Sequence, residues 1–132
     1  MINRLLAFLE RRPKIIWSII FLYAAIIFYL SSISNPPQPL SPKDPLWDLM
    51  TTLEHVAEYT ILGGLLYVGF RSLGGKTKEK AFTLAVLAAS LYGASDEMHQ
   101  YFVPNRYCDI KDFLADSAGG FIGSFAGKQF RK

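Results

Sequence analysis

An uncharged run near the N-terminus restricts the folds open to this chain more than any other feature. Residues 15–30, IIWSIIFLYAAIIFYL, carry no charged side chain. With the three residues that follow, the run approaches the about 20 residues that cross the hydrocarbon core of a bilayer as a helix. A signal peptide is the alternative, but its apolar core is only about 7–15 residues long. We therefore expect a retained membrane helix.

Three further segments are apolar or rich in small residues: VAEYTILGGLLYVGF at 56–70, AFTLAVLAASLYGAS at 81–95 and FLADSAGGFIGSFAG at 113–127. Each reaches about 20 residues when its polar outer turn is included. The sequence thus predicts an all-α membrane protein, a compact bundle of four transmembrane helices in a single domain over residues 1–132. The predicted spans are about 14–33, 53–72, 80–101 and 109–128.

The distribution of positive charge predicts how these helices are oriented. Eleven of the fourteen Lys and Arg residues fall before residue 15, within 71–80, or after residue 127. Loops that stay in the cytoplasm are enriched in Lys and Arg, so we expect both termini inside. Residues 1–12, in which Leu and Phe lie near three Arg residues, predict a short helix lying on the inner surface. The net charge of +3 is explained by topology, and a nucleic-acid partner is not expected.

The connecting segments and the helix faces carry their own signals. Five of the seven prolines lie in residues 34–50, which predicts an extended outer loop. Gly74 and Gly75 predict the end of the second helix, and a second outer loop is expected around Pro104.

Small residues recur every four positions in the last two helices, and in lipid such stripes allow two helices to approach closely, in the bundle or in an oligomer. The stripes are Ala81, Ala85, Ala89 and Gly93, then Ala115, Gly119, Gly123 and Gly127.

Ionisable residues of the last three helices gather at one depth. At about 1.5 Å per residue, counted from the inner basic residues, they lie about 18–28 Å up a core about 30 Å thick. A charge facing lipid near the bilayer centre costs at least about 2.5–3.5 kcal/mol, so we expect these side chains to turn inward to a site at the outer face. They are His55, Glu58, Asp96, Glu97, His99, Asp109, Asp112 and Asp116.

Helical spacing groups these residues further, because positions three or four apart share a face. His55 pairs with Glu58 in this way, and Asp112 with Asp116. A third set combines Asp96 with His99 and Gln100. Arg106 is the nearest cation and could neutralise the cluster or hold an anionic ligand.

Three interpretations of this cluster stay open. One is a structural network in which the charged groups satisfy one another. A second is a divalent metal site, for which the candidate ligands are His55, Glu58, Asp96, His99, Asp112 and Asp116. The third is a metal-free pocket for acid–base chemistry. Its candidate acids and bases are His55, Glu58, Asp96, Glu97 and His99, with Gln100, Arg106, Asp109, Asp112 and Asp116 as ligand-binding residues.

Three motifs in this order resemble the VanZ-like family of small bacterial and archaeal membrane proteins. They begin at His55 (HVAEYTILG), at Ser95 (SDEMHQYFVPNR) and at Asp112 (DFLADSAGGFIG). The resemblance implies a multi-pass protein of a prokaryotic plasma membrane, and the family's namesake is associated with resistance to the glycopeptide teicoplanin. Asn105 departs from the pattern, because members often have glycine before the arginine.

These observations lead to a functional hypothesis. We expect the outward-facing pocket to bind or modify a lipid-linked or surface component of the cell envelope, or a glycopeptide-related ligand. The protein as a whole is expected to be embedded in the lipid bilayer. A membrane-embedded metal-dependent hydrolase or transferase is one alternative. A small transporter that uses the acids as a proton relay is another, and a structural membrane protein is the third.

Overall fold

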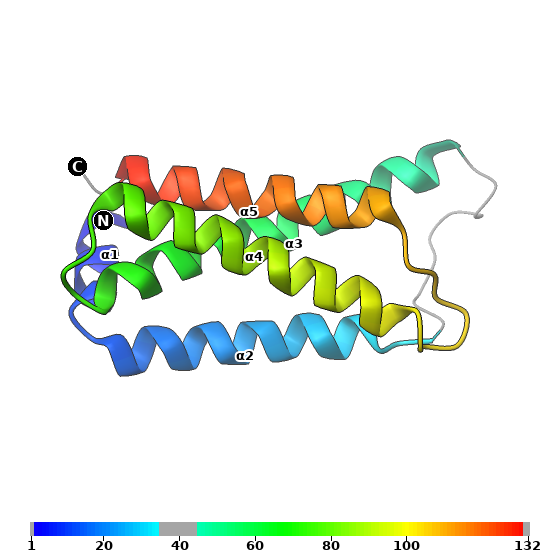
Figure 1. The fold of residues 1–132 in the computed structure, drawn as a ribbon, viewed down its shortest axis with the longest axis horizontal. Helices are drawn as coiled ribbons and strands as arrows, with labels where there is room; N and C mark the ends of the chain where they lie inside the picture. Colours follow the sequence, from blue (N-terminus) through cyan, green and yellow to red (C-terminus); the bar gives the residue numbers. More distant parts are fainter. Residues whose placement is uncertain (1, 35–44, 131–132) are drawn as a thin grey trace.

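The computed structural model describes residues 2–34 and 45–130, and over these residues it contains helices and no strand (Figure 1). The all-helical class predicted from the sequence is confirmed for this part of the chain. The helices are α1 (Ile2–Glu10), α2 (Pro13–Ser31), α3 (Pro45–Ser72), α4 (Lys78–Gln100) and α5 (Ile110–Phe130).

The four long helices run side by side and alternate in direction (Figure 1). The turn between α3 and α4 therefore lies at the same end of the bundle as both chain termini, and residues 101–109 lie at the opposite end. Helix α1 packs at the terminal end, where Arg71 Nε donates a hydrogen bond of 2.8 Å to Glu10 Oε1.

Local sequence explains where the helices begin and end. Gly74 and Gly75 adopt left-handed φ values of 71° and 64°, which glycine tolerates better than other residues, and they follow the last turn of α3. The Thr77 side chain then caps α4 by accepting a 3.2 Å hydrogen bond from the Lys80 amide.

The proline-rich segment differs from the prediction in part. Of the expected extended loop over 34–50, residues 35–44 lie outside the described residues. Residues 45–50 are helical, so the expectation of a loop is wrong there. Helix α3 begins at Pro45, whose fixed φ suits the first turn of a helix and whose missing N–H costs nothing at that position.

The small residues of α5 bring two backbones together. A Cβ added at Gly119 would lie 2.5 Å from the carbonyl oxygen of Val56 in α3, and one at Gly123 would overlap the carbonyl of Thr60. The expected packing of α5 on α4 is also present, but there Gly120 meets the Ala89 side chain. Backbone-to-backbone contact thus joins α5 to α3, a pairing that the two stripes did not predict.

Polar and small residues occupy much of the interior, while large apolar side chains lie outside. Asp116 and Ser124 are completely buried, whereas Phe21 and Leu91 are 69% and 70% exposed. An apolar core does exist where α2 meets α3, around Ile16, Ile20, Ile27, Leu62 and Leu66. Among the described helices, α2 alone is long and apolar enough to cross a membrane by the criteria of length and composition.

Candidate functional site

A cavity of about 620 Å³ lies at the end of the bundle opposite the α3–α4 turn. One wall is apolar and includes Ile27 and Leu30 of α2, together with Ile33. The other wall is rich in ionisable side chains from α3, α4, α5 and the 101–109 segment. These are Asp48, Glu54, His55, Glu58, Asp96, Arg106, Asp109, Lys111 and Asp112.

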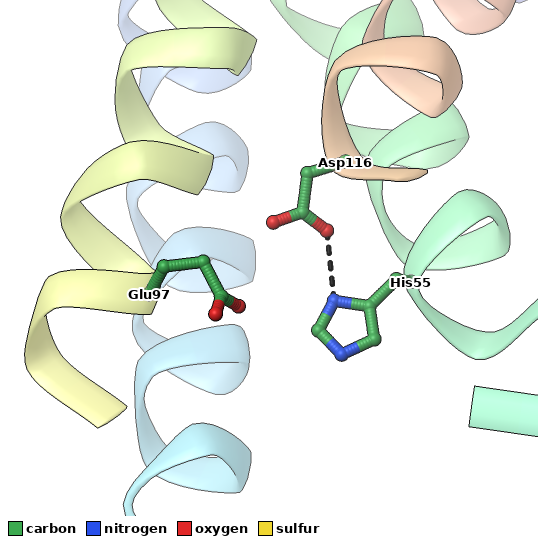
Figure 2. A group of neighbouring side chains, drawn as sticks. All are labelled: His55, Glu97 and Asp116. Atoms are coloured by element: carbon green, nitrogen blue, oxygen red, sulfur yellow. Dashed lines mark hydrogen bonds and ion pairs between the residues drawn. The ribbon is translucent and has the colours of Figure 1, made fainter. Parts of the chain in front are cut away.

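A short contact in the site joins α3 to α5. His55 Nδ1 lies 2.8 Å from Asp116 Oδ1, and His55 Nε2 lies 3.8 Å from Asp112 Oδ2 (Figure 2 shows the first contact). Space for the Asp116 carboxylate comes from α4, because a Cβ at Gly93 would lie 2.8 Å from the Asp116 Cβ. The predicted pair Asp112 and Asp116 therefore does share one face, and that face meets His55.

Glu97 belongs to the same group although its carboxylate comes from α4. The side chain is 3% exposed and points toward the gap beside His55 and Asp116 (Figure 2). Its Oε2 accepts a 2.8 Å hydrogen bond from the Asp109 amide. One ligand atom from each of His55, Glu97 and Asp116 lies within 4.8 Å of the other two, which is slightly wider than the spacing of ligands that share one metal ion.

The sequence analysis did not count Glu97 among the candidate metal ligands. The sequence could have indicated this residue, because Glu97 follows Gly93 at the same spacing of four residues that separates the small residues of the α4 stripe. The structure buries the whole of that stripe against α3 and α5. Extending the stripe by one step would have placed Glu97 in the interior.

Asp96 and Gln100 form a second polar pair in the cavity wall. Gln100 Nε2 donates a 3.1 Å hydrogen bond to Asp96 Oδ2, and both side chains are buried. Glu58 lines the same cavity, and its backbone carbonyl accepts a 3.1 Å hydrogen bond from the hydroxyl of Tyr23 in α2. The predicted i, i+4 relationship of Asp96 and Gln100 is present in the structure.

His99 does not join the other candidate residues. Its Nε2 lies 3.0 Å from Ser32 Oγ, and its ring stacks on Phe28 with centroids 4.3 Å apart. Asp96, Glu97 and Gln100 face the interior of the bundle, whereas position 99 falls on the side of α4 that meets α2. His99 therefore packs α4 against α2. It belongs neither to the group of His55, Glu97 and Asp116 nor to the cavity lining.

The segment between α4 and α5 and the first turn of α5 supply the two cations of the cavity, Arg106 and Lys111. Arg106 lines the cavity, and its Nε has no hydrogen-bond partner among the described residues. Asn105 has a φ of 62°, in the left-handed region where Asn and Gly are the most tolerated residues. This conformation explains why Asn can replace glycine before the arginine. Lys111 Nζ lies 3.7 Å from Asp48 Oδ2 in an exposed ion pair, and its amide donates to Asp109 Oδ1.

Comparison with known proteins gives one family. A model described as VanZ/LLP1 matches residues 15–131, a range that contains all but the first two residues of α2, the whole of α3 to α5 and every residue of the site. Neither the curated proteins nor the solved structures provide a match to the chain.

Proposed function

The chain belongs to the VanZ/LLP1 family, and we propose that it is a multi-pass membrane protein whose cavity binds the polar headgroup of a cell-envelope component. The observation that carries this proposal is the cavity with one apolar wall and one acidic wall. The proposal has two parts, the membrane location of the protein and the class of ligand that the cavity binds.

The surface of the bundle supports four membrane-spanning helices. Exposed large apolar side chains occur on each long helix, for example Phe21, Ile61, Leu91 and Leu114, while acids and glycines face inward. A water-soluble bundle would have the opposite arrangement, because an exposed apolar surface of this extent marks a membrane or partner interface. Acids inside the spans are expected to face the bundle interior, as they do at this site.

The placement of charge supports the inside orientation of both termini. Every Lys and Arg in the described part of the chain lies on α1, near the α3–α4 turn or at the adjoining helix ends, except Arg106 and Lys111. The positive-inside rule then assigns the cavity to the extracytoplasmic face. Helix α1 would lie at the inner surface, with Leu5 and Phe8 exposed.

The lining of the cavity defines the class of ligand. Six carboxylates line it, and among the described residues of the lining only Arg106, Lys111 and His55 can balance them. A headgroup with hydroxyl or amino donors suits such a wall, whereas a phosphate would depend on Arg106 alone in the deeper part, since Lys111 pairs with Asp48 at the exposed rim. The apolar wall from α2 would hold the adjoining hydrocarbon. Occupation of this cavity would change envelope properties such as glycopeptide sensitivity.

The proposal can be tested on full-length protein extracted from bacterial membranes in mild detergent. Lipids that co-purify would be identified by mass spectrometry for the wild type, Asp96→Asn, Arg106→Gln and the control Met98→Ala. Met98 follows Glu97 on α4 but is 62% exposed. We expect wild type and Met98→Ala to retain the same polar lipid and both site variants to lose it. Folded site variants that retain this lipid would overturn the proposal.

A cellular readout tests the same site independently. Teicoplanin sensitivity would be compared between cells expressing the wild type and a triple variant, His55→Ala with Asp96→Ala and Arg106→Ala, at equal membrane abundance. We expect the triple variant to behave like cells that lack the protein. Equal sensitivity of triple-variant and wild-type cells would contradict a role for this cavity.

A further inference from the structure

Two buried carboxylates in the interior of the bundle each keep one oxygen without a partner. Asp116 is completely buried; its Oδ1 contacts His55, and its Oδ2 has no hydrogen-bond partner among the described residues. Glu97 repeats this arrangement, with Oε2 bound to the Asp109 amide and Oε1 unpartnered. A buried polar atom without a partner costs about 1–3 kcal/mol, and more when it is charged.

The two carboxylates and His55 converge on one place (Figure 2). We propose that His55, Glu97 and Asp116 form a binding site for a divalent transition-metal ion of the zinc or manganese type. The inference goes beyond headgroup binding and does not depend on it. It assigns a ligand to the unpartnered oxygens that the cavity lining alone does not explain.

The distances are compatible with one ion. Metal–oxygen and metal–nitrogen bonds of about 2.0–2.2 Å place two ligands of the same ion at most about 4.4 Å apart. The ligand atoms of the three residues lie within 4.8 Å of one another, so side-chain movements of a few tenths of an ångström bring them into range. Asp112 lies at the other ring nitrogen, with its Oδ2 3.8 Å from His55 Nε2, so it would orient the imidazole and would not share the ion held beside Asp116.

The donor types indicate which ion would bind. One imidazole with two carboxylates suits zinc, manganese or iron, whereas magnesium and calcium favour sites made of oxygen alone. The hydrogen bond of Glu97 to the Asp109 amide holds that carboxylate in place, as outer partners of metal ligands commonly do.

Charge and access also favour an ion at this place. His55 is the only basic side chain that contacts the two carboxylates among the described residues, so a dication would balance the group more fully. His55 and Asp112 line the cavity, whereas Glu97 and Asp116 are not part of its lining. An ion could therefore enter from the cavity and would remain within reach of a bound headgroup.

The site can be tested by direct metal titration of full-length protein in detergent. Chelator-treated protein would be dialysed against ZnCl₂, MnCl₂ or MgCl₂ and its metal content measured by elemental analysis. We expect about one equivalent of zinc or manganese, and at least about 10-fold weaker binding by Glu97→Gln and Asp116→Asn, the loss typical of weakened metal coordination. His99→Ala should bind like the wild type, which separates this site from adventitious binding to a histidine.

A second measurement guards against misfolded variants. Addition of zinc or manganese should raise the thermal midpoint of wild type and His99→Ala, with a much smaller effect on Glu97→Gln. The absence of stoichiometric zinc and manganese binding in the wild type would overturn the proposal, as would undiminished binding in both isosteric variants. Either outcome leaves headgroup binding untouched, because lipid retention is measured separately.

Discussion

His55 Nδ1 lies 2.8 Å from Oδ1 of Asp116, a residue 61 positions further along the chain whose side chain is completely buried. This contact fixes α5 to α3 at the level of the site. In the metal-free protein it also orients the imidazole, because Nδ1 faces the Asp116 carboxylate. Substitutions of His55 and Asp116 should therefore have defined effects on stability and on metal binding.

Asp116→Asn and Asp116→Ala should differ in stability. The asparagine retains an oxygen that can accept from His55, so we expect the metal-free variant to unfold near the wild-type temperature. The alanine removes the acceptor and leaves a void, and we expect a loss of about 1–3 kcal/mol in the free energy of unfolding. Chemical unfolding of chelator-treated protein in detergent would measure the difference. Equal stability of the two variants would contradict the structural role of this contact.

Alanine substitutions of the two histidines should differ in their effect on metal binding. His99→Ala removes the stacking on Phe28 and the contact with Ser32, so we expect a loss of about 0.5–1.5 kcal/mol in stability with metal binding unchanged. His55→Ala should abolish stoichiometric metal binding. Parallel thermal unfolding and metal titration of the two variants would check this. Loss of metal binding in folded His99→Ala would show that the group at His55 is wrongly assigned.

Sequence spacing grouped residues that the structure brings near one cavity, but it could not determine which of them lie in contact. Helical rise placed the acids at one level, because depth depends only on residue number within a helix. Which neighbour a side chain meets depends on helix rotation, so His99 was grouped with Asp96 although it faces α2. For the same reason Glu97 was left out of the metal set, although it lies beside His55 and Asp116.

For the fold, too, the sequence predicted features that depend on local residues better than features that depend on contacts between helices. Runs of apolar or small residues identified the segments that form α2 to α5, since such a run can be read from the local sequence without reference to the rest of the chain. The start of α3 at Pro45 was missed because proline also favours extended loops. The contact of α5 with α3 was missed because a stripe of small residues does not identify its partner helix: Gly119 and Gly123 belong to the predicted stripe, but they meet α3.

Neighbouring glycines in α3 provide a matched test of that contact. A Cβ at Gly63 would overlap the carbonyl of Gly120, whereas one at Gly64 would lie 3.5 Å from the Gly123 oxygen, an ordinary contact distance. We expect Gly63→Ala to lose about 1–3 kcal/mol through overpacking. Gly64→Ala should be neutral or gain up to about 1 kcal/mol from helix propensity. Unfolding of both variants in detergent measures the contrast, and similar values would argue against backbone contact between α3 and α5.

The turn before Arg106 gives a prediction about backbone conformation. Because Asn105 has a φ of 62°, Asn105→Gly should leave stability within about 0.5 kcal/mol of the wild type, whereas Asn105→Ala should lose about 1–2 kcal/mol. Thermal unfolding would measure both, with Tyr107→Ala as the control because Tyr107 is highly exposed in the same segment. An Asn105→Ala protein as stable as the glycine variant would contradict the left-handed conformation.

The proposed orientation can be tested with the chain's lone cysteine. Cys108 is exposed in the segment at the cavity end, and Leu73 is exposed near the α3–α4 turn. With both termini inside, a membrane-impermeant maleimide should label Cys108 in intact spheroplasts, and Cys108→Ser should remove the label. Leu73→Cys in the Cys108→Ser background should react only after the membrane is permeabilised. Labelling of residue 73 in intact spheroplasts, with residue 108 protected, would reverse the topology and place the cavity on the cytoplasmic side.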